Sequence, residues 1–145
     1  MAQTRPAAGF TLIELVIALA IVAILTSIAT SSYRGYLRRG HRAEAVHALL
    51  AVAAEQEKFH LAHGSYGNRL DAAVGDDPPG LPLASRTPGG HYTLAVELAT
   101  AAEFRVVATA SGNQADPTCQ VLSIDESGRR LAANSRGADS ARRCW

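Results

Sequence analysis

Glu14 is the residue whose type and position most clearly predict chemistry in this chain. It lies alone in an apolar run, FTLIELVIALAIVAIL. A carboxylate near the centre of a membrane-length helix costs about 2.5–3.5 kcal/mol on insertion scales. A cationic partner would offset that cost, but the run contains no Lys or Arg. A cut between Gly9 and Phe10 would create an amine four residues before Glu14, and we expect that amine to pair with the carboxylate.

The two cysteines, Cys119 and Cys144, are the second candidate for chemistry. An even pair in an exported domain favours a disulfide, whereas two free thiols would fit a cytosolic protein. A bridge would tie the carboxyl-terminal tail to the edge of the domain and contribute roughly 3–4 kcal/mol in the chain-entropy model. The spacing of the pair fits no zinc motif.

No catalytic constellation is recognisable, and we predict neither an enzyme nor a cofactor or metal site. The chain has no Gly-rich phosphate loop, HExxH motif or nucleophile elbow. His60 and His63 are three residues apart, but two histidines without nearby acid or thiolate ligands are more typical of a surface than of a metal site. Two acidic pairs, Asp76-Asp77 and Asp125-Glu126, suggest either calcium ligands or turns, and turn chemistry explains them better.

Arginines form two groups along the chain. The first follows the apolar run and the second lies near the carboxyl terminus: Arg34, Arg38, Arg39 and Arg42, and then Arg129, Arg130, Arg136, Arg142 and Arg143. The first group suggests contact with lipid head groups or DNA, and the alternative, which we favour, is a solvated face at the membrane edge. The second group suggests DNA binding. The formal net charge is only +1, and acidic residues lie among the late arginines. We therefore do not favour specific DNA binding by the late arginines.

The apolar stretch from Phe10 to Ala29 has the roughly 20 residues that a bilayer-spanning helix needs. The preceding MAQTRPAAG carries one Arg and no acid, which suits a cytoplasmic leader. An ordinary signal peptide, cleaved near residues 27–29, is the alternative. Such a core would avoid Glu14, and the small residues here form no clean A-x-A site. We expect the cut to precede the apolar segment and leave it on the mature chain.

One helix is predicted from about residue 11 to 62, because no Pro lies between Gly9 and Asp77. Apolar residues in its second half form two stripes at helical spacing. The first, which we expect to cover a sheet, is Ala43, Val46, Leu49, Leu50, Ala53 and Leu61; the second is Ala45, Ala48, Val52 and Phe59. The second stripe either widens the core face or meets neighbouring subunits in a filament.

The rest of the chain predicts a long connection and a small antiparallel sheet. Gly64 is a credible helix stop, and the breaker signals DDPPG, LPL and TPGG follow before residue 90. Short strands are expected at residues 91–98, 104–110, 119–125 and 128–134, separated by turns. This pattern predicts an α+β roll in which one face of the sheet lies on the helix and the other is solvated.

These residues also resemble a known family. GFTLIELVIALAIVAIL resembles the class III signal of type IV prepilins, with Gly, Phe-Thr-Leu-Ile-Glu and an apolar helix in register. SSYRGYLRRGHRAEAVHALLAVAAEQEKFHLAHGSY resembles the helix continuation of PilE-like minor pilins, and the paired late cysteines are similar to that group as well. The resemblance covers most of the chain and is strongest over residues 9–66.

The resemblance implies roles for three residues. Gly9 would be the last leader residue, cleaved by a membrane aspartic prepilin peptidase, and Phe10 would become the N-methylated amino terminus. Glu14 would support assembly by meeting the terminal amine of a neighbouring subunit. Many pilins carry a Pro where this chain has Ser31, so only hydroxyl side chains remain to weaken the helix there by competing for backbone groups: Thr26, Ser27, Thr30, Ser31 and Ser32.

The resemblance further implies an α+β type IV pilin fold, with a long N-terminal α-helix packed on a small antiparallel β-sheet. Residues 1–9 would be the leader, 10–32 the transmembrane and filament-core segment, and 33–145 a periplasmic globular domain. That domain would comprise a helix continuation (33–63), a loop (64–90), and the sheet with a carboxyl-terminal disulfide loop (91–145).

The function implied is that of a non-enzymatic structural subunit, a minor pilin in pilus assembly and in pilus-dependent motility or adhesion. It would lie in the inner membrane with its domain in the periplasm, and then in the extracellular pilus. Its partners would be other pilin subunits, the prepilin peptidase and the inner-membrane assembly machinery. Alternatives are a major pilin, a type II secretion pseudopilin, a DNA-uptake minor pilin, and a membrane-anchored enzyme or binding module.

Overall fold

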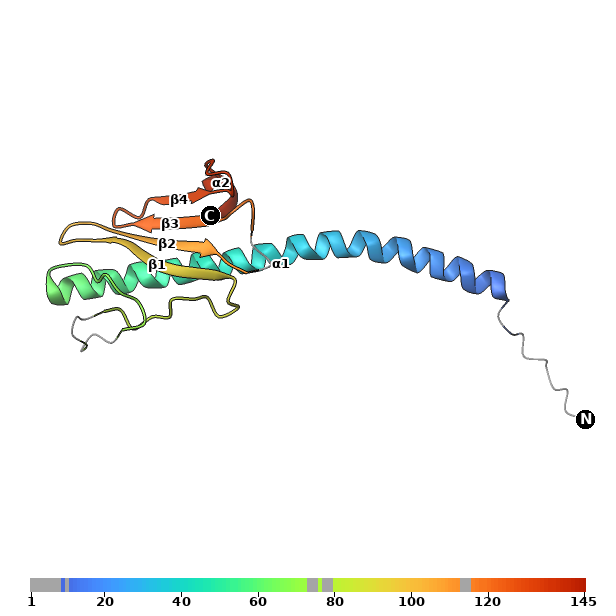
Figure 1. The fold of residues 1–145 in the computed structure, drawn as a ribbon, viewed down its shortest axis with the longest axis horizontal. Helices are drawn as coiled ribbons and strands as arrows, with labels where there is room; N and C mark the ends of the chain where they lie inside the picture. Colours follow the sequence, from blue (N-terminus) through green and yellow to red (C-terminus); the bar gives the residue numbers. More distant parts are fainter. Residues whose placement is uncertain (1–8, 10, 73–75, 77–79, 113–115) are drawn as a thin grey trace, which may run out of the picture. The chain divides into compact units, whose positions relative to one another are not determined.

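The computed structural model describes residues 9, 11–72, 76, 80–112 and 116–145. Its elements are α1 (Leu12–His63), β1 (Tyr92–Ala99), β2 (Phe104–Ala110), β3 (Val121–Asp125), β4 (Arg130–Ala133) and α2 (Ala141–Cys144). The chain forms two compact units, Met1–Leu37 and Arg38–Trp145. The α+β prediction of a long amino-terminal helix and a small antiparallel sheet is confirmed (Figure 1).

In the first unit, α1 exposes nearly everything apolar that it carries. The large aliphatic side chains from Leu12 to Ile28 are all more than half exposed, from 51% at Val16 to 80% at Leu12. Tyr33 and Tyr36 are 62% and 68% exposed. This stretch of helix is long and apolar enough to cross a membrane. Among the described residues of the first unit, these side chains are not packed into a core.

The helix continues through position 31 without a break. Thr26 donates from its hydroxyl to the carbonyl of Val22 at 2.7 Å, and Ser27 donates to the carbonyl of Ile24 at 2.8 Å. Thr30 does the same to Ser27 at 3.1 Å. These hydroxyls bond to carbonyls of the preceding turn, so the competition expected from the sequence occurs without ending the helix.

The second unit is built around a four-stranded antiparallel meander in the order β1-β2-β3-β4. The register pairs Tyr92 with Ala110 and Thr109 with Val121. β2 has the predicted bounds, but β3 begins at Val121 and not at Cys119. The difference arises because the side chain of Asp116 accepts the backbone N–H of Cys119 at 3.3 Å, which holds that residue in a turn.

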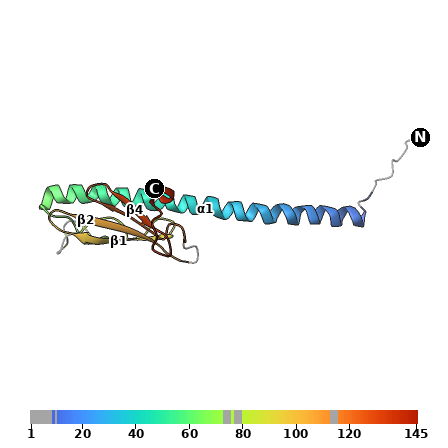
Figure 2. The ribbon, with the colours of Figure 1, turned by 90° about the horizontal axis from the view of Figure 1, so that it is seen from above.

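The part of α1 that belongs to the second unit lies along the sheet (Figures 1 and 2). Its buried face consists of Ala45, Leu49, Val52, Gln56 and Phe59, spaced alternately by four and three residues. Its four apolar members pack with Tyr92, Leu94, Phe104, Val106 and Leu122 in one core.

The predicted assignment of the two stripes is wrong in part. Leu50 is 39% exposed and Leu61 is 87% exposed, although both belong to the stripe expected to cover the sheet. Val52 and Phe59, from the other stripe, are buried at 2% and 7% exposure. Neighbouring residues on a helix are rotated by about 100°, so periodicity finds apolar stripes but does not say which one the sheet covers.

The connection after α1 is fastened to the helix. Gly64 ends α1 with a φ of +70°, as the sequence predicted. Gly67, three residues after Gly64, is bonded to the side chain of Gln56 on α1. Gln56 donates to the carbonyl of Gly67 at 2.7 Å and accepts its N–H at 2.8 Å. Arg86 then forms an isolated antiparallel bridge with Thr93. The described part of this long connection is therefore tied to both layers, and most of the DDPPG motif lies outside the described residues.

Candidate functional site

Glu14 caps the amino terminus of its own helix. Its Oε2 accepts the backbone N–H and the hydroxyl of Thr11, each at 2.9 Å, and its own N–H donates to the Thr11 hydroxyl at 3.3 Å. This reciprocal pair is a capping box. From the sequence we expected only a cation as the partner of Glu14, although the T-x-x-E pattern before an apolar run also predicts this capping partner. Gly9 is exposed, and Phe10 lies outside the described residues.

The predicted disulfide is confirmed. Cys119 and Cys144 are bonded, with their Cα atoms 5.7 Å apart. Both residues are buried, at 0% and 5% exposure. The bond joins the turn before β3 to α2, so it fixes the carboxyl-terminal segment against the sheet.

Arg42 fastens the same turn to α1. Its Nε and Nη2 atoms donate to the two carboxylate oxygens of Asp116, the second at 3.0 Å. The side chains are 19% and 4% exposed. Burial alone would raise the pKa of Asp116, but the hydrogen bonds from Arg42 and from the N–H groups of Thr118 and Cys119 outweigh it and lower the pKa. Arg42 is therefore an internal ion-pair partner, and not the lipid or DNA contact or solvated side chain considered from the sequence.

Tyr92 is a buried residue that bonds to the turn before β3. It is 1% exposed, and its hydroxyl donates to the carbonyl of Cys119 at 3.0 Å. Burial and the nearby charge of Asp116 raise the pKa of Tyr92 to about 12. The phenol therefore stays protonated at neutral pH and keeps its hydrogen bond to the turn.

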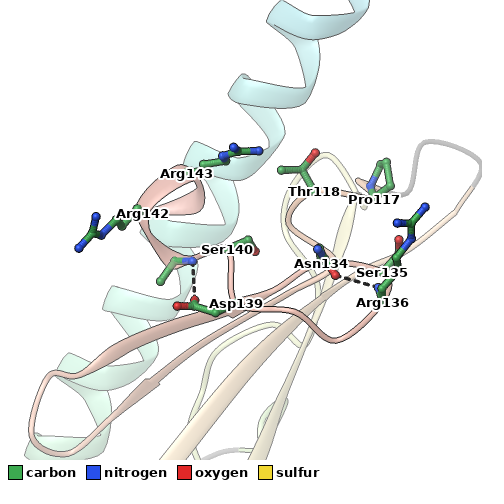
Figure 3. Close-up of a pocket in the computed structure, with 10 residues that line it drawn as sticks. Pro117, Thr118, Asn134, Ser135, Arg136, Asp139, Ser140, Arg142 and Arg143 are labelled. Carbon is green, nitrogen blue, oxygen red and sulfur yellow. Dashed lines mark hydrogen bonds between the residues drawn. The ribbon is translucent and has the colours of Figure 1, made fainter.

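Next to the disulfide, the second unit has a pocket of about 560 Å³. Figure 3 shows its wall, with Arg136 on the loop after β4 and Arg142 and Arg143 on α2. The remaining lining is mostly polar and comprises Pro117, Thr118, Asn134, Ser135, Asp139, Ser140 and Ala141. Two hydrogen bonds shape this wall: the Asn134 side chain accepts the N–H of Arg136, and the Asp139 side chain accepts the N–H of Ala141, both at 2.9 Å.

The pocket has a surplus of positive charge. It contains three arginines against one aspartate, Asp139. Arg136, Arg142 and Arg143 are all exposed, and no ion pair within the described residues uses their side chains. Exposed guanidinium groups beside hydroxyl and amide donors can bind the oxygens of a phosphate. The sequence placed these arginines in a late basic group, but it could not show that the disulfide and the turn after β4 bring them to one pocket.

The other candidate sites have local structural roles. His60 Nε2 lies 3.0 Å from the carbonyl of Ala101, and His63 Nδ1 lies 3.0 Å from that of Phe59. Asp125 accepts the hydroxyl of Ser127 at 2.6 Å and the N–H of Arg129 at 2.9 Å, which is turn chemistry. Among the residues that the structure describes, no group of three or more His, Cys, Asp or Glu side chains is placed to hold a metal ion.

Comparison with known proteins places this geometry in a family. Residues 31–123 match a family model described as "Type IV minor pilin ComP, DNA uptake sequence receptor". Residues 4–30 match a model described as "Prokaryotic N-terminal methylation motif". The fold and the amino-terminal motif define a type IV pilin. Because the first match covers more than half of the sequence, the chain belongs to the type IV minor pilin ComP family, whose members are structural proteins and not enzymes.

Curated relatives are pilins of Neisseria. The chain is 39% identical over 67 residues to a "Fimbrial protein" of Neisseria meningitidis serogroup B, covering 46% of this chain. It is 30% identical over 106 residues to a "Fimbrial protein" of Neisseria meningitidis serogroup A, covering 72% of this chain. A "Type IV major pilin protein PilE1" of Neisseria gonorrhoeae is 35% identical over 71 residues, or 49% of this chain. The chain spans 39%, 58% and 43% of the lengths of these three relatives.

Solved structures support the fold. The Neisseria meningitidis non-core minor pilin PilV matches with a TM-score of 0.53 at 17% sequence identity, covering 71% of this chain and 93% of that one. The predicted type IV pilin fold is thereby confirmed.

Proposed function

We propose that the chain is a DNA-binding minor pilin of a type IV pilus. The observation that supports this most directly is the arginine-rich pocket beside the disulfide, in a chain whose family model is described as a DNA uptake sequence receptor. From the sequence, specific DNA binding by the late arginines was not favoured, and DNA uptake was an alternative to an assembly role. The family match supports that alternative better than an assembly or adhesion role alone.

In this proposal the pocket binds the phosphate backbone. Arg136 lies on the loop after β4 and Arg142 on α2, so each can contact a DNA phosphate by charge-assisted hydrogen bonds. The hydroxyls of Thr118, Ser135 and Ser140 offer additional donors. Such contacts position a duplex but do not read its sequence.

The bonds around the pocket limit the conformational entropy that the chain loses when it binds DNA. The disulfide fixes α2, and the pair of Arg42 and Asp116 fixes the turn that bears Thr118. A binding surface whose backbone is already held loses less conformational freedom when its ligand arrives. The buried bonds thus act on DNA binding by holding the exposed arginines in place.

The amino-terminal segment serves processing and assembly in the same proposal. We infer cleavage after Gly9 and N-methylation of Phe10, on the strength of the methylation-motif match over residues 4–30. In the single chain, Glu14 has Thr11 as its partner. In a filament, the charged amine of a neighbouring subunit is the stronger partner, because a hydroxyl and an amide carry no net charge to offset the carboxylate.

This scheme implies a location and partners. The apolar part of α1 holds the chain in the inner membrane, with the second unit in the periplasm, until assembly transfers it to the pilus. Other pilin subunits then replace lipid around the exposed aliphatic side chains between Leu12 and Ile28. The prepilin peptidase and the assembly machinery act before and during this transfer.

DNA binding by the whole chain in detergent micelles tests the proposal. A random pool of labelled duplexes, enriched over several rounds and sequenced, shows whether a preferred sequence exists. Fluorescence anisotropy at several salt concentrations then measures affinity and its salt dependence. Each phosphate contact contributes about −0.9 to the slope of log K against log salt. We expect the double variant Arg136→Ala, Arg142→Ala to weaken binding and to reduce the slope by about 2.

Arg39→Ala is the matched control. Arg39 is an exposed arginine on α1 outside the pocket, so its removal should leave the slope unchanged. Absence of DNA binding by the unaltered chain would contradict the proposed function. Binding that the Arg39→Ala variant loses and the pocket variant keeps would contradict the assignment of the pocket.

A further inference from the structure

Two histidines that are far apart in the sequence, His41 and His91, stack face to face in the second unit. His41 lies on α1, and His91 immediately precedes β1. Their ring centroids are 3.4 Å apart, and the ring planes differ by 19°. The Nδ1 atom of His41 is buried and has no hydrogen-bond partner among the described residues. The stack therefore joins the helix layer to the sheet layer through two rings that can each take up a proton.

Charged groups approach this stack from α1 and from the turn before β3. Glu44 lies on the same helix, and its carboxylate accepts the N–H of Gly89 at 3.2 Å. Asp116 approaches from the turn before β3, where it is paired with Arg42. Burial and the neighbouring His91 lower the pKa of His41, while Glu44 and Asp116 act in the opposite direction and do not prevent the shift.

The stack lies at a particular end of the sheet. In the antiparallel register, Tyr92 at the start of β1 faces Ala110 at the end of β2, and Thr109 faces Val121 at the start of β3. The carbonyl of His91 also accepts the N–H of Ser111 at 2.8 Å. The loops at this end include the turn that borders the basic pocket. The histidine stack and the wall of the basic pocket therefore lie at the same end of the sheet.

We propose that the stack of His41 and His91 is a pH-sensitive clasp between α1 and the leading end of β1, closed while both rings are neutral and opened by protonation. Two neutral imidazoles can stack, whereas two imidazolium ions at this separation repel each other. This inference does not depend on DNA binding, since the clasp holds the second unit together whatever the pocket binds.

The direction of the effect follows from linkage. A His whose folded pKa is lowered binds fewer protons in the folded state than in the unfolded state. Stability is then greatest above the ordinary pKa of about 6.5 and falls as pH decreases through that value toward the folded pKa. The clasp therefore weakens in mild acid and has its full strength at neutral pH.

NMR of the whole chain in micelles with ¹⁵N-labelled histidine tests this directly. We expect His41 to titrate below the ordinary range, and the thermal midpoint to fall between about pH 7.5 and pH 5. His41→Phe and His91→Phe each keep a flat ring without its charge, so each should remove about half or more of that fall. His47→Phe, at an exposed position of the same helix, should leave it unchanged.

Two results would overturn the clasp. One is a His41 that titrates at or above the ordinary value. The other is a thermal midpoint that falls equally with pH in the unaltered chain and in both stack variants. DNA binding is measured separately at neutral pH, so its failure would leave this test intact.

Discussion

The two stretches of α1 are one continuous helix with opposite surroundings. Up to Leu37 the helix belongs to a unit in which Leu12, Leu19 and Leu25 are 80%, 60% and 61% exposed. From Arg38 onward it belongs to a unit in which Leu49 is completely buried. Both stretches are helical, but among the described residues the second stretch is packed into a core and the first is exposed.

This difference separates two sources of stability. The second stretch is stabilised by packing on the sheet and by the ion pair of its own Arg42 with Asp116, and the disulfide fixes the segment that follows the sheet. The first stretch must obtain its apolar partners from lipid or from other subunits. Mutations in the second unit should therefore alter folding of the chain, whereas mutations in the first should alter membrane insertion and assembly.

The largest expected effect is loss of the disulfide. The bonded cysteines are separated by 25 residues, which corresponds to about 3.5 kcal/mol in the chain-entropy model. We expect the double variant Cys119→Ser, Cys144→Ser to lose about that much stability in denaturant unfolding of the second unit. An unchanged unfolding midpoint would show that the carboxyl-terminal segment is held without the bond.

A matched series of leucines tests the two surroundings of α1. Leu49→Ala should destabilise the second unit by about 3 kcal/mol, because it leaves a cavity in the core. Leu50→Ala and Leu25→Ala, at positions 39% and 61% exposed, should each change its unfolding by less than about 0.5 kcal/mol. A large effect at Leu50 in addition to that at Leu49 would restore the stripe assignment first predicted from the sequence, because that stripe contains both residues.

Gln56→Leu should have a smaller effect, of about 2 kcal/mol, because the N–H and carbonyl of Gly67 lose their partners in a buried place. Hydrogen exchange at the Gly67 amide is the specific measurement, and it should accelerate. Glu57→Gln, at an exposed neighbouring position, serves as the control. Equal exchange in the Gln56→Leu and Glu57→Gln variants would contradict a fastening role for Gln56.

The smallest expected effect is a pH dependence at Asp116. Its pKa is lowered, so its ionic contribution is fully present above the ordinary value of about 3.9 and is lost as pH falls through the folded pKa. Arg42→Met should reduce this loss of thermal stability between about pH 5 and pH 2. An identical acid profile in the Arg42→Met variant would mean that the pair does not set the pKa of Asp116.

Much of the fold could be predicted from local patterns. The absence of Pro indicated α1, alternating residues and turns indicated the strands, and two cysteines in an exported context indicated the disulfide. The helix and the strands depend on residues that are neighbours in the sequence. The disulfide depends only on whether the two cysteines are bonded or free. The stripe that the sheet covers depends on the rotation of a helix against a distant layer, which no local pattern determines.

The candidate site was less predictable for the same reason. Arg42 and Asp116 are 74 residues apart in the sequence, and only the packing of α1 beside the turn before β3 brings them together. Glu14 differs, because its partner Thr11 is local. The pairing of Glu14 with a terminal amine stays a prediction, whereas its capping partner follows from its position in the first turn of a helix.

Mass spectrometry of the amino terminus, on chains recovered from sheared pili, tests most directly whether the exposed apolar stretch is the assembly element. We predict a mature chain that begins with N-methylated Phe10 and lacks Met1–Gly9. A pilus-associated chain that keeps its first nine residues, or one that begins near residue 30 after removal of the apolar stretch, would contradict this account.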